Sequence, residues 1–312
     1  MAVYKLVHTY WRPMSKHIVS VSLGSRHRDQ SGELTLLGET VRVSRQGTDG
    51  DLAAAEARIR ELDGTVDAIG LGGIDRYLVV RGRRYEIQDA VRLAQAAERT
   101  PVVDGSGLKD TLERAIIAQL DQDGLIHSAQ SVLMVSAMDR FGMAETFEKL
   151  GYRLVAGDLI FASHINYPIR SADELEEMAR KLLPEVTRMP FSQLYPVGKE
   201  QTEASDPRFS RYFEEADIIA GDFHYIRRYM PPSLAGKVVI TNTTTANDMV
   251  LLREKGVRWV VTTTPVLEGR SYGTNVIEAA LTAAAGVGSD DPRWPGVVDA
   301  AHLQGSRLKL ND

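Results

Sequence analysis

Polar residues that could bind a ligand follow five short apolar segments in the second half of the chain. The segments are residues 131–137, 153–161, 218–220, 238–240 and 259–261, and each is typical of a buried strand. The polar residues at or just after their ends are Ser136, Asp139, Arg140, Asp158, Asp222, His224, Thr241, Thr243 and Thr263. Ligands of open α/β sheets bind beyond the carboxyl ends of the strands, where hydroxyls and free backbone amides can hold an anion. Helix capping alone could explain any one of these turns, but five on one edge favour a ligand-binding cleft.

Part of a dinucleotide-binding pattern is present in this group. Asp158 stands where the acid that binds a ribose is expected, and Gly142 is the single glycine left of the Gly-x-Gly-x-x-Gly pattern. Ser136 and Met138 stand where glycines are expected, and the Met138 side chain would obstruct the usual path of the pyrophosphate. Arg140 could meet a phosphate instead, including the 2′-phosphate of NADP. The predicted residues for binding NAD or NADP are Ser136, Asp139, Arg140, Gly142, Asp158, Thr241, Thr243 and Thr263.

A histidine after the third apolar segment could carry a proton. His224 follows Asp222 by two residues, and an aspartate close to a histidine can orient its ring. We therefore predict that His224 and Asp222 are catalytic, with a purely structural histidine as the alternative. Arg227, Arg270 and Ser271 are the predicted substrate-binding residues, because arginine and serine can hold a carboxylate or phosphate.

Composition excludes several kinds of chemistry. The 312 residues contain no cysteine, so disulfides, thiolate metal sites and thiol nucleophiles are excluded. No histidine or carboxylate spacing resembles a metal site, and we predict none. The net charge of −5 gives no general attraction to nucleic acid. Since the sequence has no 18-residue apolar run and no signal-peptide pattern, we predict no membrane contact and a cytoplasmic location.

Alternating apolar strands and amphipathic helices predict how these residues are positioned. The predicted fold class is α/β, with two Rossmann-like domains, the second a doubly wound and mostly parallel sheet. The predicted domains are residues 1–123 and 124–288, followed by a C-terminal tail, 289–312, that packs back on the body. A helix predicted over 274–285 falls within the second of them. In the first half, glycines at 70–73 precede a predicted hairpin rather than a helix, so they indicate a tight turn.

Five segments together resemble bacterial proteins that carry the label quinate 5-dehydrogenase. They are DRFGMAE (139–145), AGDFHYIRR (220–228), TNTTT (241–245), TTTP (262–265) and EGRSYGTN (268–275). The likeness spans most of residues 131–285. In the shikimate/quinate dehydrogenase family a lysine and an aspartate form the catalytic pair, which the resemblance would place on Lys16 and Asp49. Here the lysine motif is absent and Gly47 replaces the asparagine of the aspartate motif, while Thr48 and Asp51 alternatively form a helix cap.

These observations lead to one functional prediction with two alternatives. The main prediction is an enzyme, an NAD(P)-dependent oxidoreductase that acts on a small hydroxylated carboxylate similar to quinate or shikimate. The alternatives are a non-redox α/β protein that binds an anionic metabolite, and a transferase that acts on a phosphorylated substrate. The incomplete glycine loop favours the non-redox alternative, because hydride transfer needs an accurately placed nicotinamide. In each case the expected partner is a small anionic metabolite, and a homodimer is compatible with the sequence.

Overall fold

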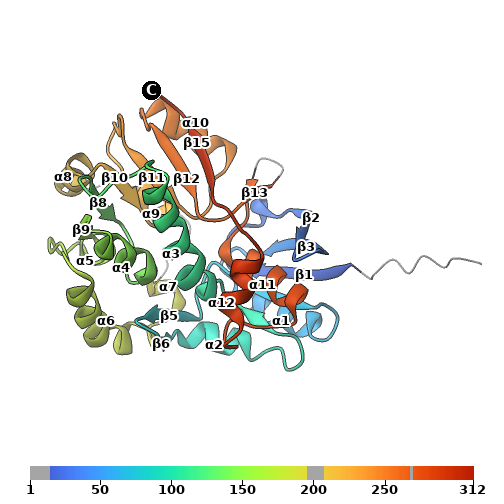
Figure 1. The fold of residues 1–312 in the computed structure, drawn as a ribbon. Coiled ribbons are helices and arrows are strands. Elements are labelled where there is room, and N and C mark those ends of the chain that lie inside the picture. Colours follow the sequence, from blue (N-terminus) through green and yellow to red (C-terminus); the bar gives the residue numbers. More distant parts are fainter. Residues whose placement is uncertain (1–14, 195–206, 268–269) are drawn as a thin grey trace, which may run out of the picture.

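The computed structural model describes residues 15–194, 207–267 and 270–312, which form two separate sheets covered by helices (Figure 1). The first sheet, here called the N-terminal sheet, has the strand order β2-β3-β1-β4-β7. Its strands are β1 (Lys16–Ser22), β2 (Ser31–Leu36), β3 (Glu39–Gly47), β4 (Ala68–Gly72) and β7 (Val102–Val103). All neighbouring strands are parallel except β2, which forms an antiparallel hairpin with β3.

Helices cover both faces of the N-terminal sheet. On one face, α1 (Leu52–Leu62) and α2 (Gln88–Ala94) bury Ile59 and Leu93 against Val19 and Leu71 of the strands. The other face packs against α11 (Thr274–Ala285). Burial on both faces explains why consecutive residues are buried along most of β1 and all of β4, without the alternation of a sheet that has one exposed face.

The second sheet, here called the C-terminal sheet, has the order β15-β12-β11-β10-β8-β9. Its strands are β8 (Ser131–Met134), β9 (Arg153–Ala156), β10 (Ile218–Ala220), β11 (Val238–Thr241), β12 (Trp259–Thr262) and β15 (Ser306–Lys309). Only β15, formed by the C-terminal tail, is antiparallel to its neighbour. The chain leaves β8 for β9 on one side and returns to β10 on the other. The carboxyl ends of β8 and β10 therefore flank the topological switch point, where ligands of such sheets bind.

The helices of the C-terminal sheet also lie on two faces. One face packs with α5 (Asp158–Ser163), α8 (Ser210–Glu215), α9 (Phe223–Tyr229) and α10 (Ala246–Glu254), and the other with α3 (Ser106–Gln122) and α4 (Phe141–Lys149). The remaining helices are α6 (Ala172–Val186), α7 (Phe191–Leu194), α12 (Trp294–Ala300) and the single 3₁₀ turns η1 (Arg26–Arg28) and η3 (Pro207–Phe209). The predicted α/β class with two Rossmann-like domains is confirmed. The strand predicted over 153–161 ends at Ala156, and its second half is α5.

Two helices join the sheets into one body. α11, which the predicted domain bounds place with the C-terminal sheet, packs on β1 and β4 of the N-terminal sheet instead. Most of its residues are buried, including Glu278 and Thr282, because it is covered on several sides. α3 starts at the N-terminal sheet, directly after β7, and packs along α4 of the other. One hydrophobic core consequently contains Ile18 and Val41 together with Val132 and Ile240.

A hairpin reaches from the N-terminal sheet across to the helices of the C-terminal sheet. It consists of β5 (Tyr77–Val80) and β6 (Arg83–Glu86), which confirms the hairpin predicted after the glycine cluster. Arg81 and Gly82 at its tip have φ angles of 46° and 76°, as a type I′ turn requires. Arg81 forms ion pairs with Glu145 of α4 and with Asp173 and Glu176 of α6. A further antiparallel pair consists of β13 (Val266–Leu267) and β14 (Arg270–Ser271).

The helices of the described ranges do not include one that is both long and apolar enough to cross a lipid bilayer.

Candidate ligand-binding site between the two sheets

Charged side chains from the carboxyl ends of both sheets meet between them. Asp75 follows β4, and Lys109 lies in the first turns of α3, just after β7. Asp139 follows β8, at the switch point of the C-terminal sheet. The Lys109 Nζ atom lies 2.7 Å from Asp75 Oδ1 and 2.6 Å from Asp139 Oδ1, so one ammonium group binds a carboxylate from each sheet.

Burial gives these three groups unusual protonation behaviour. Burial and the nearby Asp139 charge raise the pKa of Asp75 to about 8. Burial also opposes ionisation of Asp139, but Lys109 and Arg140 outweigh it and hold the Asp139 pKa below its ordinary value. Burial would favour a neutral amine on Lys109, yet the two carboxylates raise its pKa. At neutral pH the cluster therefore contains a proton on Asp75, an ionised Asp139 and a charged Lys109.

Arg140 extends the cluster into the core. Its side chain is 1% exposed and pairs through Nη1 with Glu113 Oε1 of α3, which is 0% exposed. The Thr263 hydroxyl lies 3.2 Å from the same Glu113 oxygen. Burial raises the pKa of Glu113 although Arg140 opposes the shift. Because an arginine does not lose its proton in proteins, we regard Glu113 as the counter-ion of Arg140.

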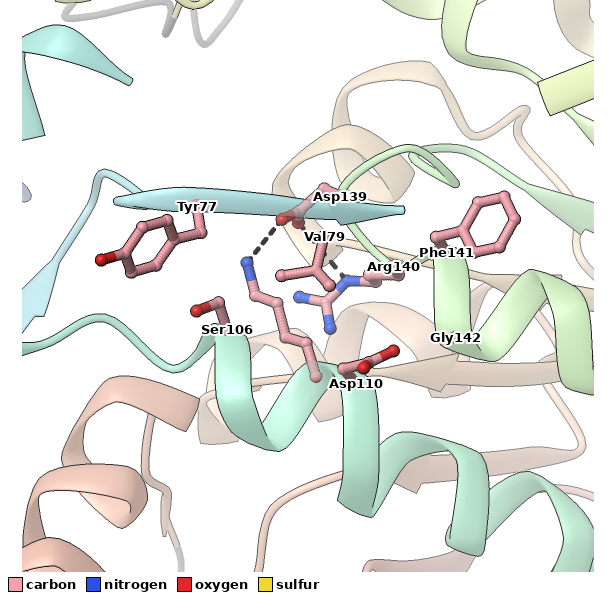
Figure 2. Close-up of a pocket in the computed structure, with 9 residues that line it drawn as sticks. Tyr77, Val79, Ser106, Asp110, Asp139, Arg140, Phe141 and Gly142 are labelled. Carbon is pink, nitrogen blue, oxygen red and sulfur yellow. Dashed lines mark hydrogen bonds and ion pairs between the residues drawn. The ribbon is translucent and has the colours of Figure 1, made fainter. Parts of the chain in front are cut away.

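Two weaker contacts connect Arg140 to the loops at the switch point. Its Nε atom lies 3.8 Å from Asp139 Oδ2, and its Nη2 atom lies 4.0 Å from Asp222 Oδ2. Figure 2 shows Asp139 in contact with both Arg140 and the amine of the lysine.

A small pocket lies against this cluster (Figure 2). It is lined by Tyr77, Val79, Ser106, Lys109, Asp110, Asp139, Arg140, Phe141 and Gly142. The hairpin residues Tyr77 and Val79 form one wall, and the starts of α3 and α4 form the others. Its volume is about 10 Å³, which is room for about one water molecule.

The hairpin wall is held in place by Asp104, the residue after β7. One Asp104 oxygen accepts hydrogen bonds from the backbone N–H groups of Arg76 and Tyr77, at 2.6 and 3.0 Å. The other oxygen accepts from the backbone and hydroxyl of Ser106, at 3.1 and 2.7 Å. Asp104 thereby ties the start of the hairpin to the start of α3, so both walls of the pocket depend on one carboxylate.

The predicted ribose acid has a different role. Asp158 Oδ1 accepts hydrogen bonds from the backbone N–H groups of Ala137 and Met138, at 2.9 and 2.8 Å. Burial raises its pKa to about 6. Asp158 therefore fixes the loop after β8, and its hydrogen-bonding capacity is directed at the protein rather than at a ribose.

The other residues predicted to bind a dinucleotide also contact protein groups. The Ser136 hydroxyl accepts from the Asp222 backbone at 3.1 Å, and the Thr241 hydroxyl donates to the Gly221 carbonyl at 2.8 Å. A Cβ on Gly142 would lie 2.7 Å from Arg114 Nε, so this glycine allows α3 and α4 to approach closely. Thr243 is half-buried in the turn after β11. Of the predicted cofactor residues, Asp139 and Arg140 line the pocket together with Gly142.

The predicted catalytic pair does not form as a side-chain contact. Asp222 Oδ1 accepts from the backbone N–H of His224 at 2.8 Å and caps α9, while Oδ2 accepts from Asn242 at 2.9 Å. The His224 ring instead faces Arg28, with 3.2 Å between Nε2 and the guanidinium Nη1. Arg28 belongs to the loop after β1, so this contact also joins the two sheets.

Lys16 and Asp49, which the dehydrogenase resemblance implied, are far apart. Lys16 begins β1 and pairs with Asp67 at 3.1 Å. Asp49 lies beyond the opposite end of the parallel neighbour β3, where it accepts from the Arg26 backbone at 2.9 Å. The strand between them is seven residues long, which corresponds to roughly 20 Å.

The predicted substrate-binding residues are engaged elsewhere. Arg227 forms an ion pair with Asp248 at 2.9 Å. The Ser271 hydroxyl accepts from the Thr244 backbone at 2.8 Å and is buried. Arg270 lies in β14, and its side chain is outside the described part of the structure.

Sequence reasoning missed Asp75, Lys109, Glu113 and Arg28. Asp75 follows the glycine cluster at the end of β4, and the rule that ligands bind at the carboxyl ends of strands indicates this position too. Lys109 and Glu113 gave no such signal, because they lie within an amphipathic helix. Among the described residues, no three histidine or carboxylate side chains are arranged to hold a metal ion.

Solved structures that resemble this fold include three substrate- or solute-binding proteins of ABC transport systems. A sugar ABC transport substrate-binding protein from Bordetella parapertussis has 11% identity and a TM-score of 0.35, covering 88% of this chain and 82% of its own. A solute-binding protein from Burkholderia multivorans has 13% identity and a TM-score of 0.36, covering 95% and 99%. One from Agrobacterium vitis, bound with α-D-tagatopyranose, has 10% identity and a TM-score of 0.38, covering 95% of each chain.

The prediction of an NAD(P)-dependent oxidoreductase is wrong. In this chain, Asp158 is bonded to the loop that should approach the pyrophosphate, and Arg140 is buried against Glu113. The residues predicted to bind a dinucleotide thus contact other groups of the protein. Sequence spacing suggested a nucleotide site because the same residue types also fix strand-end loops.

No curated protein matches the sequence. Residues 17–104, which contain the N-terminal sheet, match a family described as Domain of unknown function (DUF8753). Residues 107–304, well over half of the chain, match a second family profile. The chain belongs to that second family, Domain of unknown function (DUF8754).

Proposed function

We propose that this protein binds a small, hydroxyl-rich metabolite between the carboxyl ends of its two sheets. The observation that carries the proposal is the contact of Lys109 with Asp75 of one sheet and Asp139 of the other. Strand ends that face each other across a junction are where α/β proteins of two lobes bind small molecules.

The protonation states of the cluster favour hydroxyl groups as ligands. A protonated Asp75 and the Lys109 ammonium can donate hydrogen bonds, and the ionised Asp139 accepts them. Adjacent hydroxyls of a sugar or cyclic polyol both donate and accept. Such a ligand can therefore take over the contacts that these three side chains now make with one another.

Binding requires a movement at the pocket wall. A volume of about 10 Å³ does not admit a ring of six heavy atoms. The wall best able to move is the β5–β6 hairpin, since Arg81 holds its tip through partly exposed ion pairs. We expect the hairpin to shift away from α4 when the ligand enters.

Native mass spectrometry of the full chain tests the proposal. The protein is mixed with neutral sugars, sugar acids, sugar phosphates, quinate and shikimate, and the mass of the adduct identifies the bound class. We expect one adduct per chain, lost in Asp139→Asn and in Val79→Phe, which fills the pocket without changing charge. Glu177→Gln, which removes a surface carboxylate paired with Lys181, is the matched control and should retain the adduct. The absence of an adduct, or equal adducts with all variants, would overturn the proposal.

Several predictions from the sequence stay predictions. They are the enzymatic activity, NAD or NADP as a cofactor, the relation to quinate dehydrogenases, the homodimer and the cytoplasmic location. Including NAD and NADP in the same mixture tests the cofactor prediction directly.

A further inference from the structure

A side-chain hydrogen bond between Arg28 and His224 joins the loop after β1 to the loop after β10. The Arg28 Nη1 atom lies 3.2 Å from His224 Nε2, and both side chains are exposed. A guanidinium only donates hydrogen bonds, so the contact requires a neutral imidazole that accepts through Nε2. A charged side chain is thus matched here with a neutral acceptor rather than with a counter-ion.

The carboxylates close to this pair are already used. Asp29 accepts from Arg45 Nη1 and from the Gly47 backbone, both at 2.7 Å. Asp222 accepts from the His224 backbone and from Asn242. Among residues that the structure describes, no carboxylate lies within ion-pair distance of Arg28. Its remaining N–H groups are consequently available to a ligand.

Arg28 differs from its neighbour Arg45 in its partners, because Arg45 has Asp29 as a counter-ion at 2.7 Å. Arg45, which anchors the loop after β1, has a lowered pKa because of its burial and the repulsion from Arg28. Arg28 and Arg45 therefore lie close enough to raise the potential between them. An anion placed beside Arg28 would reduce this repulsion and supply the missing counter-ion.

Both side chains are held by rigid loops. The Ser25 hydroxyl accepts from the His27 backbone and caps η1, while Arg45 Nη1 donates to the Ser25 carbonyl at 2.9 Å. A Cβ on Gly47 would meet the Gly24 carbonyl oxygen at 2.6 Å, so the loops after β1 and β3 are in close contact. On the other side, Asp222 fixes the His224 backbone. The backbone on both sides of the pair is thus anchored by hydrogen bonds before a ligand arrives.

The pair is connected to the buried cluster. Polar contacts lead from Lys109 to Asp139 at 2.6 Å, from Asp139 to Arg140 at 3.8 Å, and from Arg140 to Asp222 at 4.0 Å. Asp222 then bonds to the His224 backbone at 2.8 Å.

We infer that Arg28 and His224 form an anion subsite, and that the ligand of this protein carries a carboxylate or phosphate which binds between them. The inference rests on the proposed function, because it names the charged group of the same hydroxyl-rich ligand. The anion accepts hydrogen bonds from the Arg28 guanidinium and from the ring of His224. It replaces the direct contact between the two side chains and links both sheets through one ligand.

Isothermal titration calorimetry with three matched ligands tests the subsite. Galactose, galacturonate and galactose 6-phosphate differ only at C6, which carries a hydroxymethyl, a carboxylate or a phosphate. We expect the wild-type chain to bind one of the charged ligands at least about tenfold more tightly than galactose, as charge-assisted hydrogen bonds imply. The preferred one of the two distinguishes a sugar acid from a sugar phosphate.

The variants Arg28→Gln and His224→Gln should reduce this preference to within about twofold and leave the affinity for galactose unchanged. Both positions are exposed, so the variants should fold, which circular dichroism checks. Arg227→Gln is the matched control, since it removes the same charge three residues from His224 but from a pair with Asp248.

Equal affinities for all three ligands would overturn the anion subsite while the proposed function stands. The anion subsite would also be overturned if Arg227→Gln lost the preference, because the positive charge of the surrounding surface would then explain the tighter binding of the charged ligands. If none of the ligands binds, the proposed function fails and the subsite fails with it.

Discussion

Arg140 and Glu113 are buried charges that have each other as the closest partner. In Glu113→Gln the guanidinium would keep only Asp139 and Asp222, at 3.8 and 4.0 Å. We expect the free energy of unfolding to fall by about 3 kcal/mol, since removing one member of a buried pair leaves a charge without compensation. Urea denaturation at neutral pH measures this change in the free energy of unfolding. Glu177→Gln, from a half-exposed pair with Lys181, is the control and should leave the midpoint unchanged. An equally small effect for Glu113→Gln would contradict this prediction, because Asp139 and Asp222 would then be enough to compensate the buried charge of Arg140.

Asp158 should make the protein less stable as the pH rises. Burial raises its pKa from an ordinary 3.8 to about 6, so between these values the folded chain holds a proton that the unfolded chain has lost. Stability therefore falls as the pH rises through this window, by roughly 3 kcal/mol for a shift of about two pKa units. Asp158→Asn keeps an oxygen that can accept from Ala137 and Met138 but cannot ionise.

Urea denaturation of wild type and Asp158→Asn, at about pH 4 and about pH 7, checks this prediction. We expect the variant to gain stability relative to wild type at the higher pH and to gain little at the lower one. A difference that does not change with pH would show that Asp158 ionises in the folded protein as easily as in the unfolded chain.

Sequence could locate the switch-point residues but not their partners. Asp139, Arg140, Asp158 and Asp222 were selected correctly as residues that follow strands. Their roles depend on groups that are distant in sequence, such as Glu113 for Arg140. A carboxylate that caps a loop and one that faces a ligand have the same sequence pattern. Only the positions of the backbone N–H groups distinguish them.

At the scale of elements, the β5–β6 hairpin is the part expected to move. Arg81→Asn should keep the turn, because asparagine tolerates a positive φ, and remove the ion pairs with α4 and α6. We expect the hairpin amides to exchange hydrogen several-fold faster, with little change in the global free energy of unfolding, because the pairs are partly exposed.

Hydrogen exchange followed by mass spectrometry measures the hairpin prediction. Arg83→Asn is the matched control, since Arg83 stacks on Tyr85 and lies beside the same turn. Its exchange should resemble that of wild type. If both variants accelerate exchange equally, the turn rather than the contacts of Arg81 holds the hairpin.

Sequence predicted the hairpin and most strands, because these depend on local alternation and on turn residues. The sequence does not show when a helix packs on the other sheet than the strands next to it in the chain. Helix α11 has the apolar pattern of any buried helix, and nothing in residues 274–285 indicates which sheet it covers. The strand predicted over 153–161 failed for a related reason, since the apolar residues of α5 continue those of β9.

At the scale of the whole molecule, the two sheets should unfold together. Helices α3 and α11 place residues of both sheets in one hydrophobic core. We expect the amides of β1 and β11 to lose protection from hydrogen exchange at the same urea concentration, as in a cooperative transition. Two separate midpoints would contradict this and would indicate that the segments matched by the two family profiles fold independently.

The α/β class and the presence of two sheets followed from alternation along the chain. The meeting of the two carboxyl edges did not, because it depends on how α3 leads from one sheet to the other. Lys109 illustrates the difference. Its helical position was predictable, whereas its contacts with Asp75 and Asp139 required the relative placement of both sheets.

The crystal structure of the full chain soaked with galactose, galacturonate or galactose 6-phosphate tests the central claim most directly. We expect a ligand at the junction of the two sheets, with hydroxyls within hydrogen-bond distance of Asp75 and Asp139 and the hairpin displaced from α4. A ligand bound elsewhere on the molecule, or a junction unchanged in crystals that take up the ligand, would contradict it.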